Sequence, residues 1–428
     1  MSLPTDPDAL RRAARRFGTP LYFTDLAVLA AAAAEVREAF PDPWLRHYSV
    51  KANDVPAVVA AVAGHGFGAN VVSRGEWAAA RQAGVANASI TLEGIGKTEA
   101  DLRAAASAAR DGQPLRWVAI ESPEEAAALA ANVRRPTRLD VLYRLNPDVS
   151  PETLPGLAVG AAGSKFGMNE TELAAAIEAG GGPEGPLRPR GIHLHVGSQL
   201  GAIDAWRDAV RRALAMTALW RGSIASFDTL DVGGGFPIFV LGEPAPSPDR
   251  FAREIPALLE VIPPDRRPVR LSIEPGRFLV ARAGWLIASV LHVRDRGGPQ
   301  VVLDAGMTEL IRPALYGARH PVLALTSFGR PEASGAGSRH AGMPSFVATR
   351  VEGPICESTD SLGVHDLPPL RRGDLVAIAD AGAYAASQSS TYNGRQRPPQ
   401  ILLEADGSLR VGRRRAGGGG AAASRPSE

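Results

Sequence analysis

The 428-residue chain has little cysteine, little lysine and no long apolar run. Its single cysteine, Cys356, excludes a framework of disulfides within the chain. The 47 Lys and Arg residues nearly balance 45 Asp and Glu residues, and a net charge of +2 gives no basic face for nucleic acid. The first residues are charged where a secretory signal would be apolar, and no stretch resembles a membrane span. We therefore expect a soluble, cytoplasmic protein with no nucleic-acid or membrane partner.

Lysine occurs at only three positions, Lys51, Lys97 and Lys165, which confines any lysine chemistry to these sites. Lys51 closes the apolar run LRHYSV and precedes a helical pattern. If that run is a barrel strand, the amine points into the barrel mouth, where burial disfavours its charge and leaves a nucleophile. Position alone equally allows a surface lysine without a special role.

Short apolar runs alternate with alanine-rich helical patterns from about residue 45 to residue 275. Eight such runs are joined by helical patterns, which predicts a parallel (β/α)₈ barrel, with an open doubly wound sheet as the alternative. The runs end near Val50, Val72, Glu93, Ile120, Leu145, Val196, Val232 and Glu274. The helical patterns cover residues 55–64, 75–83, 98–110, 123–133, 169–179, 203–221 and 249–261.

Beyond Glu274 the long helical patterns disappear, and Gly and Pro turns separate the apolar runs, which predicts a second, mainly β domain. Residues 330–344 have the composition of an irregular loop. We expect the barrel to span 25–275, the β domain to combine 1–24 with 276–412, and the low-complexity tail 413–428 to be disordered. The apolar runs of the second domain lie at 285–293, 300–304, 346–351, 374–380 and 400–404.

Two histidines, His193 and His195, alternate at the end of one predicted strand, in the segment GIHLHVGSQL. A period of two places both side chains on one face of a strand. No carboxylate or third histidine lies at a matching spacing, so we expect no metal site. Packing of an imidazole on a flat cofactor and an ordinary core histidine both remain open.

Gly233, Gly234 and Gly235 follow the predicted strand FDTLDV, and the backbone N–H groups of such a run can converge on an anion. The run lacks the Gly-Lys-Ser/Thr of a Walker loop and the spacing of a dinucleotide fingerprint. The segment EPGR ends the eighth strand, where Glu274 could meet a ring nitrogen and Arg277 could clamp a carboxylate. A surface turn with a salt bridge is the alternative for these four residues.

The β domain offers weaker candidates. Cys356 beside Glu357 is, by residue type alone, most typical of a small core cysteine. Tyr384 lies among small residues in DAGAYAASQ, which suits close packing on a ligand. Arg312 and Tyr316 are four residues apart, a spacing that fits one face of a turn and also an ordinary surface pair.

The order of these motifs resembles that of fold-type III pyridoxal-phosphate-dependent decarboxylases, the group of ornithine, arginine and diaminopimelate decarboxylases. The block DAGMTELIRPALYG is most similar to the diaminopimelate branch. The resemblance implies a cofactor-binding (β/α)₈ barrel, an alanine racemase-like C-terminal β-barrel domain, and a homodimer that shares its active sites. The motifs that carry it are YSVKAN, NVVSRGE, GIGK, SKFG, HLHVGSQ, DVGGGFP, EPGR, DAGMTELIRPALYG, GPICES, DAGAY and YNGRQRP.

The resemblance also implies roles for single residues. Lys51 would hold pyridoxal 5'-phosphate covalently, His195 would stack on its ring, and Glu274 would pair with its protonated nitrogen. Decarboxylation of an amino acid would follow, with meso-2,6-diaminopimelate converted to L-lysine and CO₂. The phosphate would be held by Ser198, Gly233, Gly234, Gly235 and Tyr384.

The resemblance assigns the remaining site residues to the substrate. Cys356, reaching in from the other subunit with Glu357 beside it, would protonate the carbanion. Arg277, Arg312 and Tyr316 would bind the far end of the substrate, where two guanidinium groups suit a carboxylate and not an ammonium.

Four departures from the family pattern leave the substrate open. Asn70 replaces the usual aspartate, so Arg144 needs another partner, and Thr359 replaces a glycine although β-branched residues disfavour positive φ. Residues 151–154 lack the usual histidines, and GAYAASQ is unusual after its third residue. A decarboxylase of another or a carrier-bound amino acid, including a polyamine paralogue, is the alternative. A catalytically inactive binding relative is a further alternative, and a racemase lacks support from the C-terminal motifs.

Overall fold

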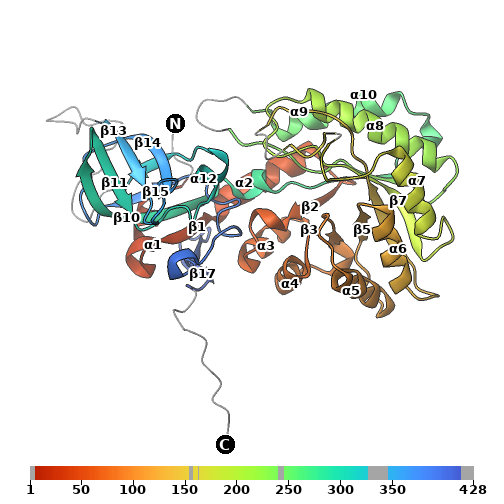
Figure 1. The fold of residues 1–428 in the computed structure, drawn as a ribbon, viewed down its shortest axis with the longest axis horizontal. Helices are drawn as coiled ribbons and strands as arrows, with labels where there is room; N and C mark the ends of the chain where they lie inside the picture. Colours follow the sequence, from red (N-terminus) through yellow and green to blue (C-terminus); the bar gives the residue numbers. More distant parts are fainter. Residues whose placement is uncertain (1–4, 154–157, 162, 240–244, 326–345, 416–428) are drawn as a thin grey trace, which may run out of the picture. The chain divides into compact units, whose positions relative to one another are not determined.

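The computed structural model describes residues 5–153, 158–161, 163–239, 245–325 and 346–415. The chain divides into two compact units (Figure 1). One unit spans Val28–Arg282, and the other combines Met1–Ala27 with Ala283–Glu428. The expected loop at 330–344 and the end of the tail, 416–428, lie outside the described residues. No helix of the described part is long and apolar enough to cross a membrane.

The unit Val28–Arg282 is a closed barrel of eight parallel strands, as the sequence predicts. Consecutive strands pair in sequence order, and the last strand closes the ring through the partners Leu45 with Ser272 and Arg46 with Ile273. The strands are short and buried on both faces, which is typical of a barrel covered by helices. They are β2 (Leu45–Ser49), β3 (Gly68–Val71), β4 (Ile90–Leu92), β5 (Trp117–Ile120), β6 (Leu139–Arg144), β7 (Leu187–His193), β8 (Thr229–Asp231) and β9 (Arg270–Ile273).

Four of the barrel helices begin directly after a residue whose side chain accepts a hydrogen bond from the first turn. Thr98 and Asn169 form capping boxes with Asp101 and Glu172, which satisfies the first backbone N–H groups of two helices. Figure 1 shows the helices lying outside the strands. They are α2 (Leu26–Ala39), α3 (Pro56–Ala63), α4 (Arg74–Gln82), α5 (Glu99–Arg110), α6 (Pro123–Asn132), α7 (Glu170–Ala179), α8 (Asp204–Arg221), α9 (Pro248–Ala252), α10 (Ile255–Glu260) and α11 (Arg277–Val280).

One helix prediction is wrong in detail. The pattern over 249–261 forms two short helices, α9 and α10, instead of one. Proline at position 256 stands in the first turn of α10 and lacks the N–H that would continue α9. The apolar periodicity survives this break, because Phe251, Ile255 and Leu258 are all buried.

The second unit is built on a nine-stranded sheet of mixed direction. Its strand β1 lies antiparallel to β10 and parallel to β16, which inserts the N-terminal segment between two C-terminal strands. Helix α1 (Pro7–Phe17) covers a core that includes Phe23, Trp285 and Ile401. The strands are β1 (Leu21–Asp25), β10 (Gly284–Asp295), β11 (Pro299–Leu303), β12 (Val322–Ala324), β13 (Val347–Glu352), β14 (Ser361–Leu367), β15 (Leu375–Ile378), β16 (Gln400–Leu403) and β17 (Leu409–Arg413), with one short helix, α12 (Arg312–Tyr316).

Candidate active site

The predicted lysine lies at the carboxyl end of the first barrel strand. Lys51 is half-buried in a single 3₁₀ turn, Val50–Ala52, that follows β2 directly. Active sites of (β/α)₈ barrels form on the loops at this end of the strands. The positive charge of Lys51 lies near enough to His193 and His195 to lower the pKa of both rings.

The three glycines allow close approach of neighbouring strand ends. A Cβ at Gly233 would lie 2.2 Å from the Leu194 carbonyl oxygen, and one at Gly234 would lie 2.3 Å from the Glu274 carbonyl oxygen. Gly233 also has a φ of 69°. Its N–H donates to Asp231 Oδ1 over 2.9 Å, and the Gly234 N–H donates to His195 Nδ1 over 3.2 Å. The N–H groups of Gly233 and Gly234 are thus engaged within the protein.

His195 is held with a defined tautomer. Because Nδ1 accepts from Gly234, the proton of the neutral ring belongs on Nε2. Burial lowers the pKa of His195 well below its usual value, and the charges of Lys51 and Arg144 lower it further. The ring is therefore neutral at pH 7, which suits packing against a flat ligand.

Glu274 follows β9 and is only 4% exposed. Its backbone is fixed by a hydrogen bond from its N–H to the Gly233 carbonyl, 2.9 Å, and by Ser49 Oγ, which donates to its carbonyl over 3.2 Å. Within the described residues its Oε1 atom is buried without a hydrogen-bond partner. A buried carboxylate oxygen in this state is a site for a donor from a ligand.

The structure brings two carboxylates to His193. Its Nε2 atom lies 3.3 Å from Glu93 Oε2 and 3.5 Å from Glu274 Oε2. The three side chains offer ligand atoms within 4.8 Å of one another. Both carboxylates follow other strands, β4 and β9, so they lie far from His193 in the sequence and no local spacing marks them.

Ser198 and Arg277 contact each other. The guanidinium donates to Ser198 Oγ through Nη2 at 3.0 Å and Nε at 3.4 Å. Arg277 is the first residue of α11 and is 6% exposed. The residues expected for phosphate and for substrate thus share one corner of the barrel mouth.

The partner of Arg144 also differs from the family pattern, as expected from Asn70. Arg144 Nη1 donates to Glu121 Oε1 over 2.5 Å, and both side chains are buried. Glu121 Oε2 also accepts from the Gly167 N–H over 3.0 Å. Asn70 instead donates to Glu93 Oε2 over 2.7 Å.

In the β unit, Arg312 is buried and lies between two tyrosine rings. Its guanidinium carbon is 5.8 Å from the centre of the Tyr316 ring and 5.7 Å from that of Tyr384. Arg312 and Tyr316 are the two ends of α12, so the four-residue spacing does place them on one face. Tyr384 has a φ of 57°, an unusual conformation for a non-glycine residue that aims its side chain from a bend between small residues.

Cys356 and Glu357 are exposed on a loop after β13, so the core-cysteine alternative is wrong. Asp360 fixes this loop by accepting from the N–H groups of Met307 at 2.6 Å and Ile355 at 2.7 Å. A Cβ at Gly353 would lie 2.2 Å from Asp360 Oδ1, so the loop closes tightly on this carboxylate.

Two further residues of this loop region matter. Thr359 is not among the described residues of positive φ, so the loss of the family's glycine causes no backbone strain there. The Asn393 side-chain amide lies 3.9 Å from Cys356 Sγ, and the neighbouring Tyr392 hydrogen-bonds to Glu357. Asn393 has a φ of 56°, which Asn tolerates better than most residues.

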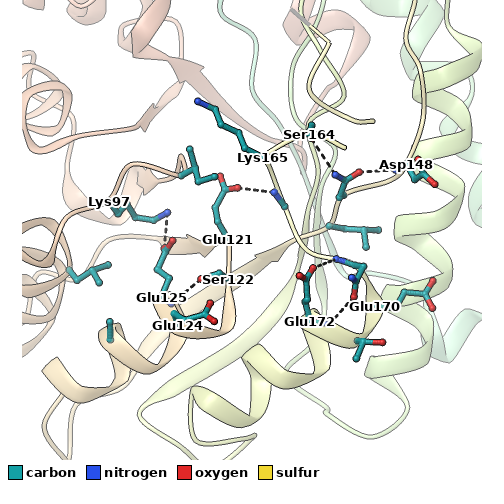
Figure 2. A pocket seen from close by; sticks show the side chains of 18 of the residues that line it. Lys97, Glu121, Ser122, Glu124, Glu125, Asp148, Ser164, Lys165, Glu170 and Glu172 are labelled. Atoms are coloured by element: carbon teal, nitrogen blue, oxygen red, sulfur yellow. Dashed lines mark hydrogen bonds and ion pairs between the residues drawn. The ribbon is translucent and has the colours of Figure 1, made fainter. Parts of the chain in front are cut away.

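A cavity of about 1150 Å³ opens at the carboxyl ends of β4, β5 and β6, beside the starts of α5, α6 and α7 (Figure 2). Lys97 and Glu125 form an ion pair of 2.8 Å at its wall. Within the described part of the chain, the residues that line this cavity include none of the predicted site residues. Apart from Glu121, its glutamates lie in the first turns of helices, where acidic side chains stabilise the helix dipole.

The carboxyl ends of the barrel strands thus carry a lysine, a neutral histidine and a buried acid, which are groups that a cofactor-dependent enzyme can use. The sequence model of the pyridoxal-dependent decarboxylase family, pyridoxal binding domain, matches residues 26–281. The chain is 36% identical to a diaminopimelate decarboxylase of Deinococcus radiodurans over 92% of each chain. It is 33% identical to one of Aquifex aeolicus over 95% of this chain and 91% of the relative. The protein belongs to the pyridoxal-dependent decarboxylases.

Solved structures give the same family. Diaminopimelate decarboxylase from Helicobacter pylori, in complex with L-lysine, superposes with a TM-score of 0.83 at 28% identity, covering 96% of this chain and 97% of that one. The enzyme from M. jannaschii, also with L-lysine, gives a TM-score of 0.83 at 27% identity over 95% and 92%.

The described residues fit pyridoxal phosphate. Glu274 Oε1 is a buried acceptor that lacks a partner in the described residues, as a protonated ring nitrogen requires. Lys51 is half-buried and accessible, and the His195 ring is neutral beside it. The sequence argument missed Glu93 as a site residue, although it marks the end of an apolar run where barrel chemistry gathers.

Proposed function

We propose that this protein decarboxylates meso-2,6-diaminopimelate to L-lysine with pyridoxal 5'-phosphate as its cofactor. The observation that carries the proposal is the buried Glu274 oxygen, which has no hydrogen-bond partner among the described residues and lies at a strand end of a pyridoxal-dependent decarboxylase. The relatives cited above are diaminopimelate decarboxylases, and two of their structures hold L-lysine, the product of this reaction. A cytoplasmic location is part of the proposal.

In this proposal the barrel residues hold the cofactor. Lys51 holds its aldehyde carbon, His195 packs on the ring, and Glu274 accepts from the ring nitrogen and keeps it protonated. Ser198, with the close turn of Gly233, Gly234 and Gly235 and with Tyr384, holds the phosphate. When bound, the cofactor supplies the electron sink for the carbanion that loss of CO₂ leaves at Cα.

The substrate end is assigned to arginine and tyrosine. Arg277, Arg312 and Tyr316 bind the distal carboxylate, because planar guanidinium groups pair with carboxylates in a bidentate manner. Arg312 supports this role, since two aromatic rings fix its orientation and burial strengthens its charge interactions. Ornithine and lysine carry an ammonium at this end, which two arginines repel.

Cys356 is proposed as the proton donor to the carbanion, with Glu357 beside it. Its thiol is exposed in the single chain, so it is available to the active site of a partner protomer. We infer a homodimer in which each protomer supplies Cys356 to the site of its partner. Asp360 keeps the thiol-bearing loop closed, which limits the freedom of the proton donor.

The test is CO₂ release by purified holoenzyme from a panel of substrates. The panel contains meso-diaminopimelate, ornithine, arginine, lysine, glutamate and carboxynorspermidine, with chromatographic analysis of the amine product. We expect L-lysine from meso-diaminopimelate and little turnover of the others. Bound cofactor without CO₂ from diaminopimelate would refute the substrate, and turnover of another member would reassign it.

A further inference from the structure

Four acid–base side chains meet at the carboxyl ends of four barrel strands, and the proposed mechanism uses only one of them, Glu274. Glu93 follows β4, His193 ends β7 and Asp231 ends β8. Each of the four is at most 4% exposed. His193 Nε2 lies between the two glutamates, 3.3 Å from Glu93 and 3.5 Å from Glu274. The carboxyl groups of Glu93 and Glu274 are also within hydrogen-bonding reach of each other.

Three carboxyl groups buried together cannot all be ionised, because burial and like charges both disfavour the anions. Burial, followed by the charge of Glu274, raises the pKa of Glu93 to about 8. Burial, followed by the charges of Glu274 and Glu93, raises the pKa of Asp231 well above its usual value. Burial lowers the pKa of His193 to about 4, although the charge of Glu93 opposes this shift. Near pH 7 these shifts therefore favour the neutral forms of Glu93, Asp231 and His193.

The surrounding groups agree with this charge state. The neighbour that touches Glu93 is the neutral amide of Asn70, which donates over 2.7 Å and orients the carboxyl group. Within the cluster, His193 is affected by three further charged residues: the charges of Arg144 and Lys51 lower its pKa, and the charge of Glu121 raises it. Arg144 is engaged with Glu121 at 2.5 Å, so the two largely cancel.

We propose that Glu93 is a positioning residue of the cofactor site. Its neutral carboxyl group donates a hydrogen bond to Glu274, and this bond holds Glu274 as the single anion that faces the ring nitrogen. This inference rests on the role proposed above for Glu274. The buried Oε1 atoms of both glutamates lack hydrogen-bond partners in the described part of the chain, which leaves capacity for a shared proton and an incoming N–H.

The arrangement links cofactor binding to the proton on Glu93. Above about pH 8 the free site gains a second negative charge, which favours a cationic ring. Equivalently, a bound pyridinium lowers the pKa of Glu93, because a nearby positive charge stabilises its anion. Glutamine at this position keeps the shape and hydrogen bonds but cannot change charge.

The experiment compares apoenzyme of the wild type and of Glu93→Gln by equilibrium dialysis with pyridoxal 5'-phosphate from pH 6.5 to 9.5. The ratio of the variant Kd to the wild-type Kd cancels the ionisations of the cofactor itself. We expect this ratio to rise with pH up to about pH 8 and then to level off, with a total rise of about tenfold for each unit by which the cofactor lowers the pKa of Glu93. Glu309→Gln is the control, because it removes a buried carboxyl of the β unit that lies outside the cluster.

Each outcome decides a separate point. A ratio that stays flat across the range, with binding intact, overturns the role of Glu93 and leaves that of Glu274. Glu274→Gln tests the foundation: if this variant binds the cofactor as tightly as wild type at every pH, the error lies in the proposed function. If Glu93→Gln does not fold, Asn70→Asp serves instead, because a carboxylate beside Glu93 should move the pH step upward. An unmoved step contradicts the inference.

Discussion

Gly234 is the position where a single methyl group should separate cofactor binding from folding. In Gly234→Ala the new Cβ would lie 2.3 Å from the Glu274 carbonyl oxygen and 3.2 Å from its carbonyl carbon. The φ at Gly234 is not in the left-handed region, so the backbone itself accepts alanine. The strain is therefore a contact between β8 and β9 that must open by roughly 1 Å to reach van der Waals distance.

Opening that contact moves the residue that should face the ring nitrogen. Overpacking of this kind costs about 1–3 kcal/mol of folding free energy, which corresponds to a Tm drop of about 2–4 °C per kcal/mol for a unit of this size. A displaced Glu274 also loses a charge-assisted hydrogen bond worth about 1.5–3 kcal/mol. We expect the Kd for pyridoxal phosphate to rise about ten- to a hundredfold.

Equilibrium dialysis and thermal unfolding of the apoenzyme measure the two effects separately. Gly96→Ala is the matched control, because a Cβ there meets nothing within 4 Å and its φ is not left-handed. A lower Tm with unchanged cofactor affinity would reduce Gly234 to a packing role. Unchanged affinity and unchanged Tm together would refute the argument from close approach.

Three further substitutions test the site. Cys356→Ala should retain cofactor binding and lose most turnover, and wild-type activity in this variant would remove the thiol from the mechanism. Arg277→Ala should raise KM for diaminopimelate about ten- to a hundredfold, the value of a charged hydrogen bond, at constant cofactor affinity. An unchanged KM with weaker cofactor binding would instead indicate that the Arg277 guanidinium binds the phosphate, beside Ser198. Asp360→Asn should lower kcat more than it raises KM, because it loosens the loop that carries Cys356. An unchanged kcat would mean that this loop keeps its conformation without the Asp360 carboxylate.

The barrel was predictable because its signals are local. Each strand is a short apolar run that ends at a turn, and the observed strands end within three residues of the expected positions, from Ser49 for β2 to Ile273 for β9. The apolar pattern predicted one helix where Pro256 divides it into α9 and α10. The strands β1 and β12 were missed, and both pair with segments distant in the chain. The strands β14 and β17 pair with the strands directly before them, but they contain too few apolar residues to form an apolar run.

The site was predictable in its residue types and not in its contacts. Lys51, His195 and Glu274 could be selected because each follows a strand of one barrel, whose carboxyl ends converge. The contact of His193 with Glu93 joins positions a hundred residues apart, and no spacing rule contains it. Glu93 still carried a signal, since an acid that ends a barrel strand is a candidate on that ground alone.

The dependence of stability on acid pH tests the burial of His47 in the barrel, independently of the cofactor. His47 is 2% exposed, contacts Ser272 Oγ at 3.1 Å and packs edge-on against Trp117. Burial, followed by the charge of Arg116, lowers the pKa of His47 to about 3. Between about pH 6.5 and pH 3, His47 therefore binds a proton in the unfolded chain but not in the folded chain. The contribution of neutral, buried His47 to the free energy of unfolding is complete above about pH 6.5 and is lost towards pH 3.

His47→Asn should flatten this acid branch while lowering stability at neutral pH through lost packing. The slope of unfolding free energy against pH should fall by up to about 1 kcal/mol per pH unit between pH 6 and 4, measured by urea denaturation. His193 contributes in the same direction and remains in the variant, so part of the slope persists. His292→Asn, at an exposed position, should leave the slope unchanged. Equal slopes in wild type and His47→Asn would mean that His47 gains its proton inside the folded barrel without cost, contrary to its burial beside Arg116.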